Sequence, residues 1–203
     1  MEKVDEFTYL GSIVSSKKAT HKDINSRLGK AQCAFAVLRP IWRSKQLRLK
    51  TKIRIYNSNV KSVLLYGSEC WRVIQSDMKR LDAFNNRCLR RICGVYWPNV
   101  ISNKDLFKVT KTRCLTDDIK CRRMRWLGHV FRMEPDRTAK IALRWTPPGK
   151  RKPRRPRTTW RRTITTELAE NHLTLGEAQN WARDRLWWKQ FVVALCPTGG
   201  EEE

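Results

Sequence analysis

The sequence predicts a mainly α-helical protein that begins with a small β-hairpin. After about residue 20, apolar residues recur three and four positions apart, which is the spacing of one helix face. Residues 7–14 instead carry Phe, Tyr, Ile and Val around Gly11, a pattern typical of short strands and a turn. Capping pairs such as Thr174 with Glu177 mark helix starts. These three observations define the expected fold class.

The first half of the chain predicts three long helices over about residues 22–42, 47–71 and 77–93. Pro40 should end or kink the first helix, because proline lacks a backbone N–H. Gly94 should stop the third. The expected inward faces are Ile24, Leu28, Ala31, Phe35 and Leu38; Leu49, Ile53, Tyr56, Val60 and Leu64; and Leu81, Phe84, Cys88 and Ile92.

The second half predicts shorter helices with recognisable starts. They cover, in order, about residues 102–109, 116–132, 137–144, 159–170 and 175–195. Ser102 with Asp105 forms a variant of the capping box, and Thr174 with Glu177 forms the usual one. Thr116 is the expected N-cap of the helix that follows it.

The composition indicates a folded chain with three regions. The 203 residues are 40% hydrophobic and include nine Trp, which argues against disorder. We expect a hairpin region over residues 1–20, a helical region over 21–110 and a basic helical region over 111–203. The last of these contains a Pro- and Arg-rich loop at 145–157.

The formal charge of +24 predicts a polyanionic partner. Nucleic acid fits this profile better than an anionic membrane surface, and no apolar run approaches the roughly 18–20 residues of a membrane span. The polar start is not a signal peptide. Seven cysteines, an odd number lying mostly in helical patterns, suit reduced thiols. We therefore expect an intracellular protein, nuclear or cytoplasmic.

The most basic stretch runs from Arg144 to Arg162, with nine Lys or Arg in nineteen residues and no carboxylate. Prolines keep part of it extended, so a row of cations could follow a phosphate track, and binding should weaken steeply with salt. A solvated basic linker is the alternative. Residues 153–157 resemble a minor-groove AT-hook, but Arg155 stands where that motif has its central glycine, so this match is discounted. The expected phosphate contacts here are Lys150, Arg151, Lys152, Arg154, Arg155 and Arg157.

Two helices carry further basic faces. The second predicted helix has Lys50, Arg54 and Lys61 on the face opposite its apolar stripe. The helix beginning near residue 116 carries Arg122, Arg123 and Arg125 beside Trp126. These arginines are candidates for phosphate contacts, whereas Trp126 is interpreted mainly as core, with base stacking as the alternative.

No residue pattern predicts catalysis, a metal or a cofactor. Cys114, Cys121 and His129 lack the close pairing of zinc ligands, and His129 is interpreted as a packed helix residue. Asp117 and Asp118 lie at a helix start, where carboxylates favour the helix dipole, and no third carboxylate is evident for a two-metal site. We expect this chain alone not to be an enzyme.

Four strings, at residues 7–11, 64–71, 125–132 and 149–160, resemble in this order the carboxy-terminal part of LINE-type (non-LTR) retrotransposon reverse transcriptases. The first contains Tyr9-Leu10-Gly11 and the third contains Trp126-Leu127-Gly128-His129. The resemblance implies that Tyr9, Leu10 and Gly11 occupy a primer-grip position, followed by a helical thumb and a basic tail. It also implies that the polymerase carboxylates lie upstream of Tyr9.

The resemblance implies that the thumb helices present Lys50, Arg54 and Lys61 to a template–primer duplex, with the basic tail adding further contacts. The expected partners are RNA, an RNA–DNA hybrid or duplex DNA, with no cofactor. Two alternatives are a basic architectural DNA-binding protein and the product of a pseudogene. The sequence leaves the oligomeric state and the element clade undecided.

Overall fold

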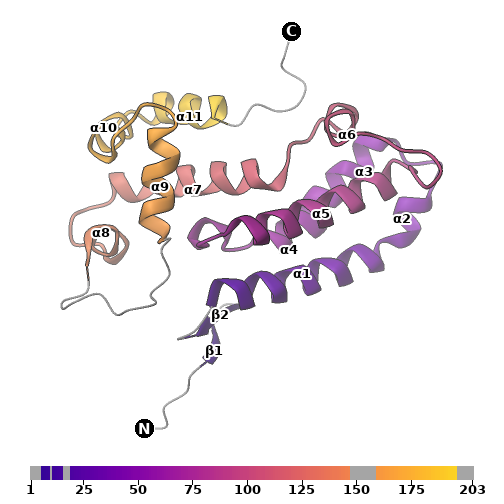
Figure 1. Cartoon of the computed structure of the whole chain (residues 1–203), viewed down its shortest axis with the longest axis horizontal. Helices are drawn as coiled ribbons and strands as arrows, with labels where there is room; N and C mark the ends of the chain where they lie inside the picture. Colours follow the sequence, from indigo (N-terminus) through magenta and orange to yellow (C-terminus); the bar gives the residue numbers. More distant parts are fainter. Residues whose placement is uncertain (1–5, 10, 16–18, 147–158, 196–203) are drawn as a thin grey trace. The chain divides into compact units, whose positions relative to one another are not determined.

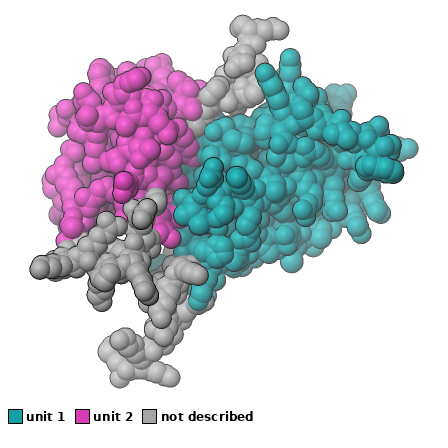
Figure 2. Space-filling view, viewed as in Figure 1, with its two compact units in different colours: residues 1–68, 73–119, 197–203 teal, residues 69–72, 120–196 magenta. Residues whose placement is uncertain are grey.

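The computed structural model describes residues 6–9, 11–15, 19–146 and 159–195. It confirms the mainly α fold with an antiparallel hairpin at the amino end (Figure 1). The chain forms two compact units (Figure 2). Unit 1 comprises residues 1–68, 73–119 and 197–203, and unit 2 comprises 69–72 and 120–196. The expected regions divide at residue 110, whereas these units divide within the helix that begins at Leu115.

The hairpin of unit 1 pairs β1 (Glu6–Tyr9) with β2 (Ser12–Ser15), in a register that sets Phe7 opposite Val14 and Tyr9 opposite Ser12. Gly11 in the turn has φ +77°, a left-handed conformation that glycine adopts without the penalty a Cβ brings. The predicted hairpin therefore has a two-residue connection that requires its glycine.

The first predicted helix is divided into two helices near Pro40, as expected. Helix α1 (Ala19–Val37) ends before Pro40, and α2 (Arg39–Arg43) begins with that proline in its first turn. The expected stripe of α1 is buried from Ile24 to Phe35. Phe35 stacks on Trp42 of α2 with ring centres 5.1 Å apart, and the Trp42 indole N–H donates to the Phe35 carbonyl.

The segment expected to form one helix over residues 47–71 consists of several pieces. It comprises α3 (Leu49–Tyr56), a π-helical turn η1 (Asn57–Lys61), α4 (Ser62–Leu64) and, after a turn at Gly67, a 3₁₀ turn η2 (Ser68–Cys70). The apolar stripe nevertheless stays inward, because Ile53, Tyr56, Val60 and Leu64 are all buried. Buried Tyr56 donates its hydroxyl proton to Asn85.

Helix α5 (Gln75–Ile92) packs against α1, α2 and α3 within unit 1. Its predicted inward residues are buried, and Gly94 follows it with φ +70°. Helix α6 (Asn103–Thr110) starts at the predicted cap, where Ser102 accepts from the Asp105 amide.

The start of α7 (Leu115–Arg132) differs from the prediction. Thr116 does not cap it; instead Asp82 of α5 accepts hydrogen bonds from the Leu115 amide at 2.7 Å and from the Thr116 hydroxyl at 2.8 Å. A carboxylate from another helix thus satisfies the free amide at this N-terminus. Sequence spacing could not predict a cap that comes from 33 residues away.

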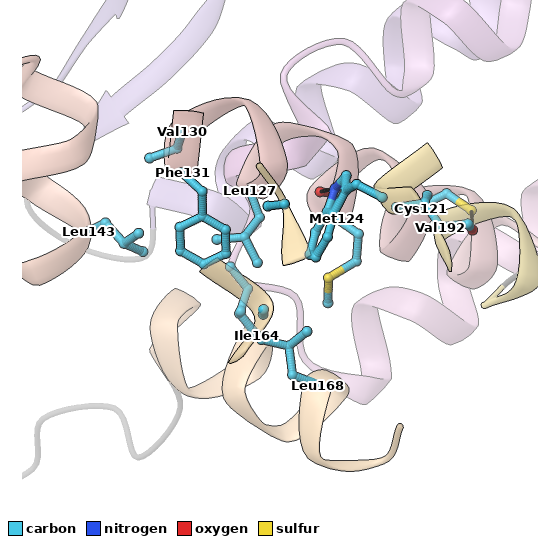
Figure 3. Packing of buried hydrophobic residues seen from close by; sticks show 12 residues of the cluster. Cys121, Met124, Leu127, Val130, Phe131, Leu143, Ile164, Leu168 and Val192 are labelled. Atoms are coloured by element: carbon cyan, nitrogen blue, oxygen red, sulfur yellow. Dashed lines mark hydrogen bonds between the residues drawn. The ribbon is translucent and has the colours of Figure 1, made fainter. Parts of the chain in front are cut away.

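Unit 2 packs α7 against α8 (Thr138–Arg144), α9 (Trp160–Ala169), α10 (Leu175–Trp181) and α11 (Arg185–Ala194). Figure 3 shows Phe131 of α7 directed toward Leu143 of α8 and Ile164 of α9. Thr174 and Glu177 form the predicted capping box of α10. The expected single helix over 175–195 is broken, because Asp184 caps a new helix through the Leu186 and Trp187 amides.

Candidate nucleic-acid interface

A buried cation, Arg27 of α1, joins the hairpin to the helices of unit 1. Its Nη2 donates to Ser12 Oγ at 3.2 Å, and its Cζ lies 4.5 Å from the centre of the Tyr66 ring. Its Nε is 3.9 Å from a carboxylate oxygen of Asp23, which also accepts from the Ile13 amide at 3.2 Å. Arg27 is only 6% exposed, so these contacts replace part of the water that a guanidinium normally binds, while its buried Nε makes no hydrogen bond to a described group.

This network brings two of the four sequence strings together. A Cβ on Gly11 would lie 3.4 Å from Arg27 Nη2, and a Cβ on Gly67 would lie 3.4 Å from Ser12 Oγ. Gly67 also has φ +73°. A Cβ at these distances would make only ordinary van der Waals contact, so it is the left-handed backbone conformation that favours glycine at both positions. Tyr9, the expected primer-grip aromatic, lies beside this turn and is 62% exposed, whereas Leu10 lies outside the described residues.

The second feature is an exposed basic surface on α2, α3 and the loop between them. From Ile24 to Ser68 the sequence contains no Asp or Glu. Two of the predicted contacts, Lys50 and Arg54, are exposed four residues apart on α3, a separation of about 6 Å along a helix. The exposed cations of this α2–α3 basic surface are Arg39, Arg43, Lys45, Arg48, Lys50 and Arg54.

The acidic side chains described in unit 1 are used internally. Asp77 contacts His21 at 2.9 Å, Asp82 caps α7, and Asp105 accepts from the Ser102 hydroxyl. Asp117 accepts from the Cys114 thiol, and Asp118 pairs with Arg113 at 2.7 Å. These contacts agree with the expected structural role of Asp117 and Asp118 at a helix start. Because these carboxylates are engaged in contacts elsewhere in unit 1, the positive charge of the α2–α3 basic surface is largely uncompensated.

The other predicted cations lie in different settings. Lys61 is 14% exposed and forms an ion pair with Asp118, so its ammonium is already engaged within unit 1. In unit 2, Arg125 is exposed and Arg122 is half-buried. The six predicted contacts between Lys150 and Arg157 lie outside the described residues.

The placement of Arg123 contradicts its expected role as a surface contact. It is 1% exposed and pairs with Glu167 of α9. Burial raises the pKa of the Glu167 carboxyl, and the Arg123 guanidinium acts in the opposite direction by stabilising the carboxylate. A helical spacing of cations could not distinguish the inward arginine from its neighbours, because the partner carboxylate lies 44 residues away.

The Trp126–His129 string has a packing explanation in unit 2. Gly128 lies beneath the indole of Trp188, whose N–H donates to the Met124 carbonyl at 3.0 Å. A Cβ on Gly128 would approach Trp188 Nε1 to 2.1 Å, so only glycine fits this position. Trp126 packs against the core as expected. His129 is exposed, which corrects its interpretation as a packed residue.

No described group of three or more His, Cys, Asp or Glu side chains is arranged to hold a metal ion. Among the helices that the structure describes, none has both the length and the apolar character needed to cross a membrane.

The structure also reveals four arginines that the sequence analysis did not select. Arg39 and Arg43 of α2 and Arg87 and Arg91 of α5 line one cavity of unit 1. Each pair has a spacing of four residues, which places both members on one helix face. That spacing was visible in the sequence, but the packing of α2 on α5 that unites the pairs was not.

Comparison with known proteins links the chain to transposons. It is 25% identical over 201 residues to the uncharacterized transposon-derived protein F52C9.6 of Caenorhabditis elegans, a match covering 95% of this chain and 71% of that protein. Residues 34–66, which include all six cations of the α2–α3 basic surface, match the family described as Domain of unknown function (DUF6451). No solved structure matches the chain. The similarity supports a transposon-related origin.

Proposed function

We propose that this chain is the thumb and carboxy-terminal region of a LINE-type reverse transcriptase and that it binds nucleic acid. The α2–α3 basic surface carries the proposal, because its exposed cations lie in a stretch without carboxylates. The ordered strings that resemble this enzyme class and the similarity to a transposon-derived protein support the same assignment.

The role we propose is binding rather than catalysis. Lys50 and Arg54 would contact the phosphates of a template–primer duplex, and such contacts position a protein on a duplex without reading its sequence. The hairpin, held by Arg27, would present exposed Tyr9 near the primer end. The basic segment over residues 150–157 would add phosphate contacts. Polymerisation itself would depend on carboxylates that this chain does not supply. We expect the protein to act in the nucleus or the cytoplasm.

Neutralising the α3 contacts should weaken binding selectively. We expect Lys50→Gln with Arg54→Gln to lower affinity for an RNA–DNA hybrid about tenfold near physiological salt. The slope of log K against log salt is negative and should become less steep by about two, because two phosphate contacts no longer release counterions. Fluorescence anisotropy with a labelled hybrid over a salt series measures both quantities.

The matched control is Lys104→Gln with Lys108→Gln on α6. This pair is also exposed in unit 1, has the same spacing and removes the same charge. If both double variants weaken binding equally, only net charge matters and the assigned surface is wrong. Unchanged far-UV circular dichroism would confirm that neither variant disrupts the helices.

A further inference from the structure

Unit 1 contains a cavity of about 440 Å³ whose floor is aromatic and whose rim is cationic. Phe35, Trp42, Phe84 and Cys88 form the floor and are buried. The volume lies within the usual range for small-molecule sites, which is roughly 300–1,000 Å³.

The rim consists of Arg39, Arg43, Arg87 and Arg91, all exposed, together with Tyr96. No carboxylate lines this cavity, and none of the four arginines forms an ion pair with a described residue. Tyr96 is 59% exposed and also lines the cavity. The rim therefore presents four guanidinium groups that could bind an anion.

The floor favours an uncharged, planar group. Burial raises the pKa of the Cys88 thiol to about 12 even though Arg87 and Arg91 lower it, so the thiol stays neutral at physiological pH. Phe35 and Trp42 stack on each other, and both line the cavity. A ligand that combines a flat ring with an anionic group matches both floor and rim.

We propose that this four-arginine cavity binds one unpaired nucleotide of a nucleic-acid strand. Its phosphate would be held by the arginines, and its base would lie over the aromatic floor beside Tyr96. A base stacked within a duplex cannot enter such a cavity, whereas an unpaired base at a strand end can. The inference rests on the proposed nucleic-acid binding and adds a preference for strand ends with an unpaired nucleotide.

The test compares a blunt RNA–DNA hybrid with the same hybrid bearing a one-nucleotide overhang. We expect the full chain to bind the overhang form at least about tenfold more tightly. Arg87→Gln with Arg91→Gln should abolish that advantage, because two charge-assisted phosphate contacts are lost. The Lys50→Gln, Arg54→Gln variant should weaken both forms equally and keep the advantage.

A second variant fills the cavity without changing charge. Ala36 lines it from α1 and is exposed, so Ala36→Phe should leave the fold intact and remove the overhang advantage. Ala83→Phe on α5 is the control, because Ala83 is also exposed but does not line the cavity.

The outcomes separate the two proposals. If the unaltered chain binds neither hybrid, the proposed function fails. If it binds both equally, or if the cavity variants keep the overhang advantage, nucleic-acid binding stands and the cavity assignment is overturned.

Discussion

Gly128→Ala should destabilise unit 2 by about 3 kcal/mol. The added Cβ would lie 2.1 Å from Trp188 Nε1 and 2.5 Å from its Cδ1, far inside van der Waals contact. Overpacking a core costs about 1–3 kcal/mol, and loss of the indole hydrogen bond leaves a buried donor without its acceptor, at about 1–3 kcal/mol. The better helix propensity of alanine offsets about 1 kcal/mol.

The Trp188 ring has little room to move away. It is 3% exposed, its ring centre is 5.3 Å from that of Phe191, and Phe131 meets it edge-on at 6.3 Å. A shift large enough to clear the new methyl group would therefore disturb aromatic neighbours on α7 and α11.

Hydrogen exchange on the full chain measures this effect by unit. Amides of α7, α9 and α11 should lose protection, while those of α1 and α5 keep it. Gly176→Ala is the control, because no atom lies within 4 Å of its added Cβ and this variant should be neutral or slightly stabilising.

A double-mutant cycle tests the cause directly. Once Trp188→Leu has removed the indole, adding Gly128→Ala should cost little more. Full additivity of the two costs, or native-like protection in Gly128→Ala alone, would show that the indole does not impose glycine at this position.

Arg27→Met should have the second largest effect, about 2–4 kcal/mol on the docking of the hairpin. The change removes the Arg27 guanidinium from beside the Asp23 carboxylate, which is 4% exposed, and it removes the hydrogen bond to Ser12 and the contact with Tyr66. Removing one partner of a buried ion pair typically costs about 3–5 kcal/mol, and the 3.9 Å separation here supports a cost around or below the lower end of that range.

The readout for Arg27→Met is the exchange rate of the Ile13 amide, which donates to Asp23. This rate should rise sharply, whereas Arg27→Lys should recover part of the protection because it keeps the charge. Lys30→Met is the control on the same helix: its ammonium also contacts the hairpin, at 3.4 Å from the Gly11 carbonyl, but in an exposed position. Equal exchange in Arg27→Met and the unaltered chain would refute the role of Arg27.

Most helices and their inward faces were predictable from local patterns. The period of Leu81, Phe84, Cys88 and Ile92 placed α5 correctly, and the Thr174–Glu177 capping box placed the start of α10. One difference between the predicted and the observed helices arises where a residue distant in sequence sets the start of a helix. At the start of α7, Asp82 of α5 takes the place of the expected cap Thr116. A local residue accounts for the other difference: Asp184 caps α11 within the apolar pattern that predicted one continuous helix.

The candidate site was less predictable than the fold. Lys50 and Arg54 are exposed as expected, whereas Arg123 and Lys61 are held by Glu167 and Asp118. A run of cations does not reveal which of them meet a carboxylate after folding. The four cavity arginines could not be predicted as one group either, because only the packing of α2 on α5 brings the two pairs together.

The most direct test of nucleic-acid binding is the affinity of the purified full chain for three ligands over a salt series. These are an RNA–DNA hybrid, duplex DNA and structured RNA. We predict tighter binding to the hybrid or to element-like structured RNA than to duplex DNA, with a salt slope that indicates several phosphate contacts. Equally weak binding to all three, lost at moderate salt, would contradict the assignment and reduce the chain to a non-selective polycation.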